Sequence, residues 1–192
     1  MWNRFFSKLF ITLIACGLTG CMTIRVKAIN PHPNIAIMPS HSSLSLKFND
    51  SILDTFVVKK FGGQFNIAEW KKSLENGFTN AFSDSHRLEK NGDYQIFIKE
   101  ASLDFPSQKS HGNTYIINSS EHIHVDSIQS IFATLRYNAL LLDKSGNILD
   151  LAAGTIMSNE IGDPWDTENR VGEVIARFYE EIAREFFGKN SH

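Results

Sequence analysis

The first twenty residues constrain the fold most, because they decide where the folded chain begins. Arg4 and Lys8 supply positive charge, and no acidic residue precedes position 21. The apolar run over residues 9–16 is far shorter than the ~20 residues that a membrane-spanning helix needs. A basic start, a short apolar run and small residues are typical of a secretory signal. We therefore predict a signal peptide over residues 1–20, with an uncleaved anchor helix or a buried N-terminal helix as the alternatives.

The segment Leu18-Thr19-Gly20-Cys21 resembles the lipobox of bacterial lipoproteins. The resemblance implies signal cleavage between Gly20 and Cys21 and a lipid thioether on Cys21. Two or three acyl chains anchor a protein stably to a bilayer, whereas one binds only marginally. In enterobacterial lipoproteins an aspartate after the cysteine retains the protein in the inner membrane, and here Met22 follows it. The resemblance thus implies a periplasm-facing protein of the bacterial cell envelope, held on the outer membrane through acylated Cys21.

Composition narrows the class of the mature chain. Residues 21–192 have the size of one ordinary domain. Losing Arg4 and Lys8 leaves the chain mildly acidic, which argues against a nucleic-acid partner. Cys16 leaves with the signal and Cys21 becomes a thioether, so neither a disulfide nor a thiol nucleophile is expected. An apolar core must therefore stabilise the fold, and the 15 Phe residues of the chain favour one.

Breaker residues divide the mature chain into a tether and a domain. Two prolines in residues 30–34 interrupt any regular element, so we expect a lipidated tether over residues 21–34. A single α+β domain is expected over residues 35–189, beginning with short strands at 35–38, 44–48 and 55–58.

Two segments have helical periodicity. Residues 67–82 place apolar side chains three or four positions apart, with Asn66 as the expected cap and Glu69 completing a capping box. Residues 168–187 repeat the pattern, with Asp166 or Thr167 as the cap and Gly188 at the end. Both segments predict amphipathic helices.

Strand patterns fill the remainder. They cover residues 94–105, 127–142 and 147–157, and the segment 143–146 (Asp-Lys-Ser-Gly) predicts a tight turn between the last two. Residues 107–121 are polar and favour a loop, with 114–117 as an edge strand. The predicted fold is an α+β sandwich, with an antiparallel sheet and two amphipathic helices packed on one face.

His122 and His124 are the candidate metal ligands. Alternate residues of a strand share a face, about 7 Å apart, so Asp126 would join them and His111 could approach from the loop. Two imidazoles and a carboxylate can coordinate zinc. The alternative is a polar strand face without a metal.

Other candidate residues lie around the start of the last helix. Four carboxylates between Glu160 and Glu168 could bind calcium, but favourable interaction with the helix dipole is the preferred interpretation. Trp165 is the candidate binding residue, since loop tryptophans often anchor partners. The alternative is that Trp165 covers the seam between helices and sheet. We find no nucleophile elbow and no phosphate loop, and we therefore expect neither an enzyme nor a cofactor.

The layout resembles a group of small lipoproteins. Cys21, the helix around residues 68–74, the strand 94–105, the hairpin 141–146 and the final helix are similar to ABC-transport auxiliary and YajG-like lipoproteins. The resemblance implies a non-catalytic accessory or assembly component that binds envelope proteins. The alternative is a periplasmic carrier of a small ligand or lipid, with a groove between helices and sheet.

Overall fold

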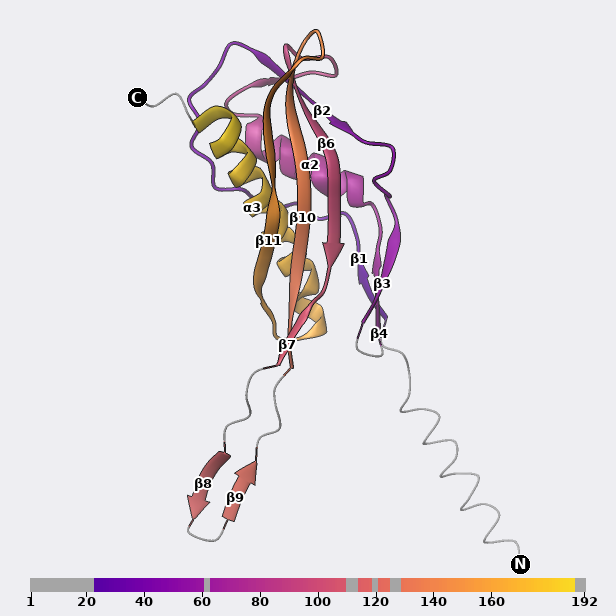
Figure 1. Cartoon of the computed structure of the whole chain (residues 1–192), viewed down its shortest axis with the longest axis vertical. Coiled ribbons are helices and arrows are strands. Elements are labelled where there is room, and N and C mark those ends of the chain that lie inside the picture. The colour runs from indigo at the N-terminus through magenta and orange to yellow at the C-terminus, as the bar shows by residue number, and fades with distance from the viewer. Residues whose placement is uncertain (1–22, 61–62, 110–113, 119–120, 125–128, 189–192) are drawn as a thin grey trace, which may run out of the picture.

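A sheet lies over two helices in an elongated domain (Figure 1). The computed structural model describes residues 23–60, 63–109, 114–118, 121–124 and 129–188. The large sheet has six strands in the order β11-β10-β6-β2-β5, and β7 pairs with the start of β10. Its strands are β2 (Ser43–Phe48), β5 (Arg87–Leu88), β6 (Tyr94–Asp104), β7 (Ser107–Lys109), β10 (Gln129–Asp143) and β11 (Ile148–Ile161).

The large sheet is mixed, which corrects one part of the predicted fold. Strands β6, β7 and β11 run antiparallel to β10, but β2 is parallel to both β5 and β6. Parallel neighbours need a crossover of about a dozen residues or more. Residues 49–93, which contain a helix, supply that crossover between β2 and β6. The α+β class and the two helices on one face are confirmed.

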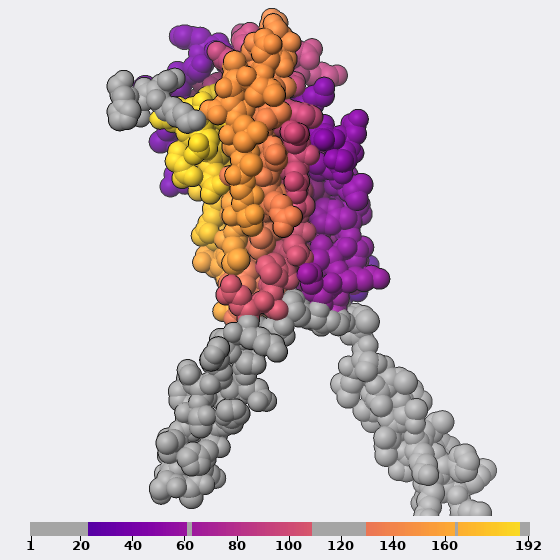
Figure 2. Space-filling view, in the orientation of Figure 1, coloured from indigo at the N-terminus to yellow at the C-terminus, as the bar shows by residue number. Residues whose placement is uncertain are grey.

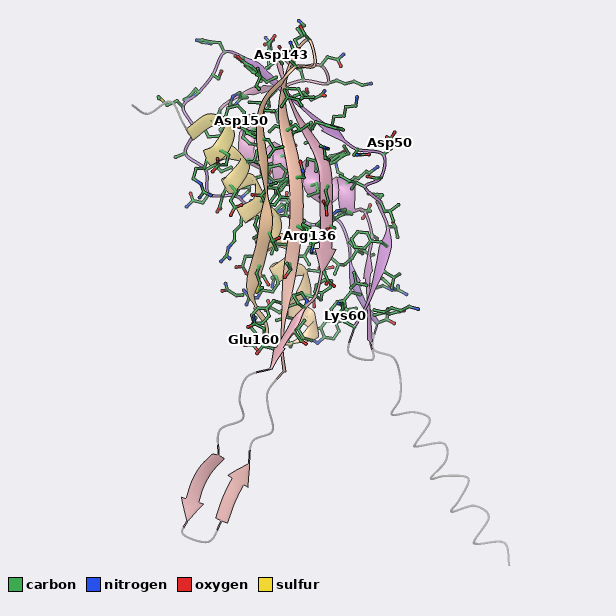
Figure 3. The ribbon with its side chains drawn as sticks, viewed as in Figure 1. Asp50, Lys60, Arg136, Asp143, Asp150 and Glu160 are labelled. Carbon is green, nitrogen blue, oxygen red and sulfur yellow. The ribbon has the colours of Figure 1, made fainter. Side chains whose placement is uncertain are left out.

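Side chains of β10 alternate between the two faces of the sheet from Ala133 to Ala139. On β10, Ala133, Leu135 and Tyr137 are buried against the helices, and the Tyr137 ring lies 5.0 Å from that of Phe178. Arg136, between Leu135 and Tyr137, points out from the opposite face (Figure 3). The strands of that face lie uncovered in the space-filling view (Figure 2).

The helices are α2 (Trp70–Phe82) and α3 (Thr167–Phe187). They pack closely because α2 carries Gly77 at their contact, where an added Cβ would lie 2.7 Å from the Tyr179 ring. The Tyr179 hydroxyl donates to the carbonyl of Leu74 at 2.8 Å and joins the helices in the buried core.

The predicted cap of α2 is wrong. Asn66 belongs to a strand, and Glu69 stands before the helix in the left-handed conformation, with φ 55°. The Asp54 carboxylate instead accepts from the Lys71 amide at 2.9 Å, and the Asp54 carbonyl accepts from the Trp70 amide at 2.9 Å. A residue sixteen positions before the helix therefore satisfies its first amides, which no capping box within the helix sequence could indicate.

A small second sheet corrects the predicted tether. Its strands are β1 (Thr23–Val26), β4 (Gly63–Ile67) and β3 (Phe56–Lys60), in the order β1-β4-β3. Residues 23–26 pair with β4 in parallel, and Val26 is buried in the core. The chain then crosses the helices, where the Ile29 amide donates to Ser73 at 2.9 Å and the Asn34 amide to Glu180 at 2.8 Å. Residues 23–34 are thus part of the fold, because tertiary partners replace the regular element that the prolines interrupt.

Residues 35–38 form no strand in this structure, although their apolar sequence predicts one. The segment is extended but outside every ladder, and Met38 is 75% exposed. Extended chain becomes a strand only when a neighbouring strand offers main-chain partners.

The predicted hairpin between β10 and β11 is confirmed. Asp143 accepts from the amides of Ser145 and Asn147, and Gly146 adopts φ 86°. A second hairpin consists of β8 (Thr114–Asn118) and β9 (Glu121–His124) and forms a separate two-stranded sheet. The predicted edge strand at 114–117 therefore exists, paired with β9.

Candidate functional site

Several predicted site residues have no described side chain. Gly20 and Cys21 precede the first described residue, so the cleavage and lipidation sites remain predictions. His122 and His124 lie on β9, opposite Ile116 and Thr114, but their side chains are outside the described part. The metal site likewise remains a prediction.

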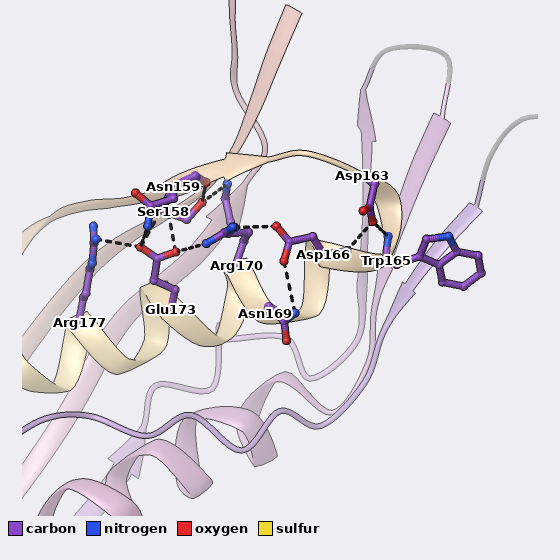
Figure 4. A network of polar contacts seen from close by, with 10 residues as sticks. Ser158, Asn159, Asp163, Trp165, Asp166, Asn169, Arg170, Glu173 and Arg177 are labelled. Atoms are coloured by element: carbon purple, nitrogen blue, oxygen red, sulfur yellow. Dashed lines mark hydrogen bonds and ion pairs between the residues drawn. The ribbon is translucent and has the colours of Figure 1, made fainter.

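Trp165 is the predicted site residue whose position is most informative. It lies in η1 (Pro164–Asp166), the short turn before α3, and its side chain is 91% exposed. The indole points away from α3 (Figure 4). The alternative that Trp165 covers the seam between helices and sheet is therefore wrong.

The turn that carries Trp165 is held by Asp163. Its Oδ1 accepts from the amides of Trp165 at 2.8 Å and Asp166 at 3.0 Å. Asp166 occupies the cap position of α3, as predicted, but its carboxylate caps no amide and instead binds Arg170 at 2.8 Å. The capping carboxylate is therefore Asp163, which accepts from two amides at the positive end of the helix.

An ion-pair network joins α3 to the edge of the sheet. Glu173 binds Arg170 at 3.2 Å and Arg177 at 2.8 Å, and it also accepts from the Asn159 amide (Figure 4). Arg177 donates to the Met157 carbonyl at 2.9 Å. These contacts cover the outward main-chain groups of β11 near its end. The i,i+3 and i,i+4 charge spacing along α3 could have indicated this network in the sequence.

The domain has two ends with different surfaces. The Thr23 end contains the start of β1, the paired residues Lys60 of β3 and Gly63 of β4, and η1. The Asp143 end contains the turn between β10 and β11. Lys60 and Glu160 mark the first end, and Asp143 and Asp150 lie toward the second (Figure 3).

A groove opens at the Asp143 end, between the C-terminal half of α3 and residues 34–42. Its volume is about 890 Å³. Apolar side chains line it together with the charged residues Glu180 and Arg184. The apolar lining includes Ile35, Ile37, Met38, Leu149, Phe186 and Phe187.

His86 forms part of the groove wall. It is buried, its ring lies 4.9 Å from that of Phe187, and its Nδ1 is 2.9 Å from the Ser85 hydroxyl. Burial lowers the pKa of His86, because the charged imidazolium loses hydration there. The groove wall therefore carries a neutral imidazole near pH 7.

Large apolar side chains are exposed beside the groove. Ile148 is 64%, Leu149 51% and Leu151 53% exposed, and Met38 faces the same groove as Leu149. We call Met38, Ile148, Leu149 and Leu151 the apolar patch. The sequence did not single out these residues, because β11 has the composition of an ordinary half-buried strand.

The described residues offer neither a cluster that could hold a metal ion nor a helix that could cross a membrane. There, His, Cys, Asp and Glu side chains do not gather in groups of three or more that could hold a metal ion. Neither α2 nor α3 combines the length and the hydropathy of a membrane-spanning helix.

Comparisons with known proteins find only one kind of similarity, to solved structures. No protein-family model matches it, and no curated protein matches it in sequence. Among solved structures, it is similar to a minor lipoprotein from Acinetobacter baumannii, with a TM-score of 0.45 and 13% identity, over 75% of this chain and 91% of that one. A likeness of this size assigns neither a family nor a function to the chain.

Proposed function

We propose that this chain is a lipid-anchored, non-catalytic protein of the bacterial cell envelope that binds another envelope protein through the apolar patch. Acylated Cys21 would hold it on the membrane. The Met22 that follows the cysteine favours the outer membrane. The accessory role implied by the resemblance to ABC-transport auxiliary and YajG-like lipoproteins fits this proposal. The apolar patch is the observation that carries it.

The patch differs from ordinary scattered exposure. Ile148, Leu149 and Leu151 lie within four residues of one strand, with Asp150 between the last two, and Met38 lines the same groove as Leu149. Single exposed apolar residues are normal, whereas contiguous ones mark interaction sites. Their position at the end opposite Thr23 presents them away from the anchor.

The edge of β11 favours a polypeptide as the occupant. Arg177 and Glu173 bind the outward main-chain groups of Met157 and Asn159. Ala153 and Thr155 face the same way, because no register shift separates them from Met157. Within the described part of the chain, no side chain binds their outward amides and carbonyls. An added strand would supply main-chain partners there, as in strand-addition complexes.

Photo-crosslinking in cells tests the proposal. A photoreactive phenylalanine analogue at Leu151 should give one discrete protein adduct. The matched control is Leu53, which is 61% exposed and lies outside the patch. Leu151→Asp should weaken binding of the crosslinked protein about 10-fold or more, the scale of an interface hot spot. Leu53→Asp should leave binding intact, and equal behaviour of the two variants would contradict the proposal.

The groove supports a second candidate, a carrier of a small ligand or lipid. Its volume of about 890 Å³ and its apolar lining suit such a molecule. Native mass spectrometry should then show a bound mass that Ile37→Glu removes and Leu53→Asp retains. A ligand-free spectrum for the unaltered protein would count against the carrier.

A further inference from the structure

Trp165 is exposed in a way that packing does not explain. The chain has three tryptophans, and Trp2 lies in the predicted signal. Trp70 is 1% exposed and donates from Nε1 to the Ala101 carbonyl, whereas Trp165 is 91% exposed. The backbone of the turn that carries it is held by Asp163, which accepts from two amides.

Trp165 and the start of the described chain lie at the same end of the domain. The Lys27 amide, just after β1, donates to Glu168 in the first turn of α3 at 3.3 Å. From there β1 leads back to Thr23, whose register partner is Gln64 near the start of β4. Figure 1 shows the start of β1, the start of β4 and the N-terminus of α3 at one end.

The distance from Thr23 to the lipid attachment site is short. Cys21 is two residues before Thr23, so even fully extended chain allows only about 7 Å between their Cα atoms. Thr23 itself is fixed in the small sheet, where its hydroxyl accepts from Gln64 at 3.2 Å. An acylated Cys21 would therefore bring the Thr23 end of the folded domain directly to the membrane surface.

We infer that the Thr23 end is a membrane-contact surface on which Trp165 inserts its indole into the headgroup region of the bilayer. This inference rests on the proposed lipidation of Cys21. Tryptophan favours membrane–water interfaces, because its ring is apolar and its N–H still finds a polar partner.

Charges at the same end are compatible with this contact. Lys59 and Arg25 are exposed on the outer face of the small sheet. Of the acids at this end, Asp104 pairs with Lys60, Glu168 accepts from the Lys27 amide, and Asp163 accepts from two amides, whereas Glu160 is exposed. Exposed cations suit phosphate headgroups.

Tryptophan fluorescence of the full-length, cell-processed protein tests the inference. The protein is reconstituted in vesicles of phosphatidylethanolamine and phosphatidylglycerol, with or without bromine on the acyl chains. Trp165→Phe leaves the buried Trp70 as the background. A second variant carries Trp165→Phe with Leu151→Trp, which moves the reporter to the Asp143 end. Mass spectrometry of the purified protein establishes whether Cys21 is acylated.

The expected result is an emission shift to shorter wavelength and strong quenching by brominated lipid, both lost in Trp165→Phe. The Leu151→Trp reporter should not be quenched. If Cys21 is acylated and Trp165 emission is unquenched, or the reporter at position 151 is quenched equally, the membrane-contact surface is refuted while the proposed function stands. A chain without acyl groups on Cys21 refutes both.

Discussion

The two ends of this domain differ in how they expose apolar side chains. At the Asp143 end, four large apolar residues form a patch beside a groove, and the lining includes the exposed side chains of Met38 and Leu149. At the Thr23 end, one indole stands alone on a turn that hydrogen bonds hold in place. A broad patch suits another protein surface, whereas an isolated aromatic ring near an anchor suits an interface of lipid and water.

Because the surfaces at the two ends differ, a single domain can bind a different partner at each end. The strands β10 and β11 extend between the ends, and α3 packs along them. An anchor at one end then fixes the direction in which the other end points.

The two tryptophans provide the largest expected effect. Trp70→Ala should lower the free energy of unfolding by roughly 3–5 kcal/mol, the usual cost of truncating a buried aromatic side chain. Trp165→Ala should change it by less than about 0.5 kcal/mol, because the side chain touches little. Urea denaturation measures both. A large loss for Trp165→Ala would mean that its indole supports the fold and is not kept for binding.

The close contact between α2 and α3 stabilises the core that connects the two ends. Gly77→Ala should destabilise the protein by about 1–3 kcal/mol, because the added methyl group meets the Tyr179 ring and Ile175. Gly172→Ala is the matched control on α3, where the added Cβ meets only the Cγ2 methyl of Ile29, at 3.2 Å. Thermal denaturation compares them, and equal losses would contradict the close packing at Gly77.

Removal of the Asp163 carboxylate should destabilise the turn that carries Trp165. Asp163→Ala should cost about 1 kcal/mol, since two amides at the start of α3 lose their acceptor. Asp163→Asn keeps an acceptor oxygen and should recover most of that stability. Hydrogen exchange should speed up at the amides of Trp165 and Asp166 and stay unchanged at the Asp143 end. Unchanged exchange at both amides would show that Asp163 does not hold the turn.

The smallest effect concerns pH and the Asp143 end. Burial lowers the pKa of His86 below the usual 6.5, so the unfolded chain binds a proton first as the pH falls. Stability contributed by neutral His86 is complete above about pH 6.5 and declines as the pH falls toward the lowered pKa. Unfolding free energies at about pH 7.5 and about pH 5.5 should differ less in His86→Phe than in the unaltered protein. An equal pH dependence would exclude His86 as the cause.

Local patterns predicted most of the elements. The α3 span, the strand beginning at Tyr94 and the Asp143 turn follow from periodicity and turn chemistry alone. Longer-range features could not be predicted in this way. The cap of α2 comes from Asp54, and the parallel placement of β2 depends on how a long crossover returns to the sheet.

The candidate surfaces divide in the same way. The sequence singled out Trp165 as a loop tryptophan, but only the structure decided that it faces solvent and does not cover the seam. The groove and the apolar patch combine residues 34–42, β11 and the end of α3, which are far apart in the chain. Spacing within one segment carries no information about such neighbours.

The sequence by itself determined the α+β class, the two amphipathic helices and the signal and lipobox predictions, because each depends on a local pattern of charge and hydrophobicity. The tertiary structure decided that residues 23–34 belong to the fold, that the sheet is mixed, and that Trp165 and the apolar patch lie at opposite ends. These features depend on which distant segments satisfy each other's main-chain groups and bury each other's side chains. That choice is a property of the whole packed chain.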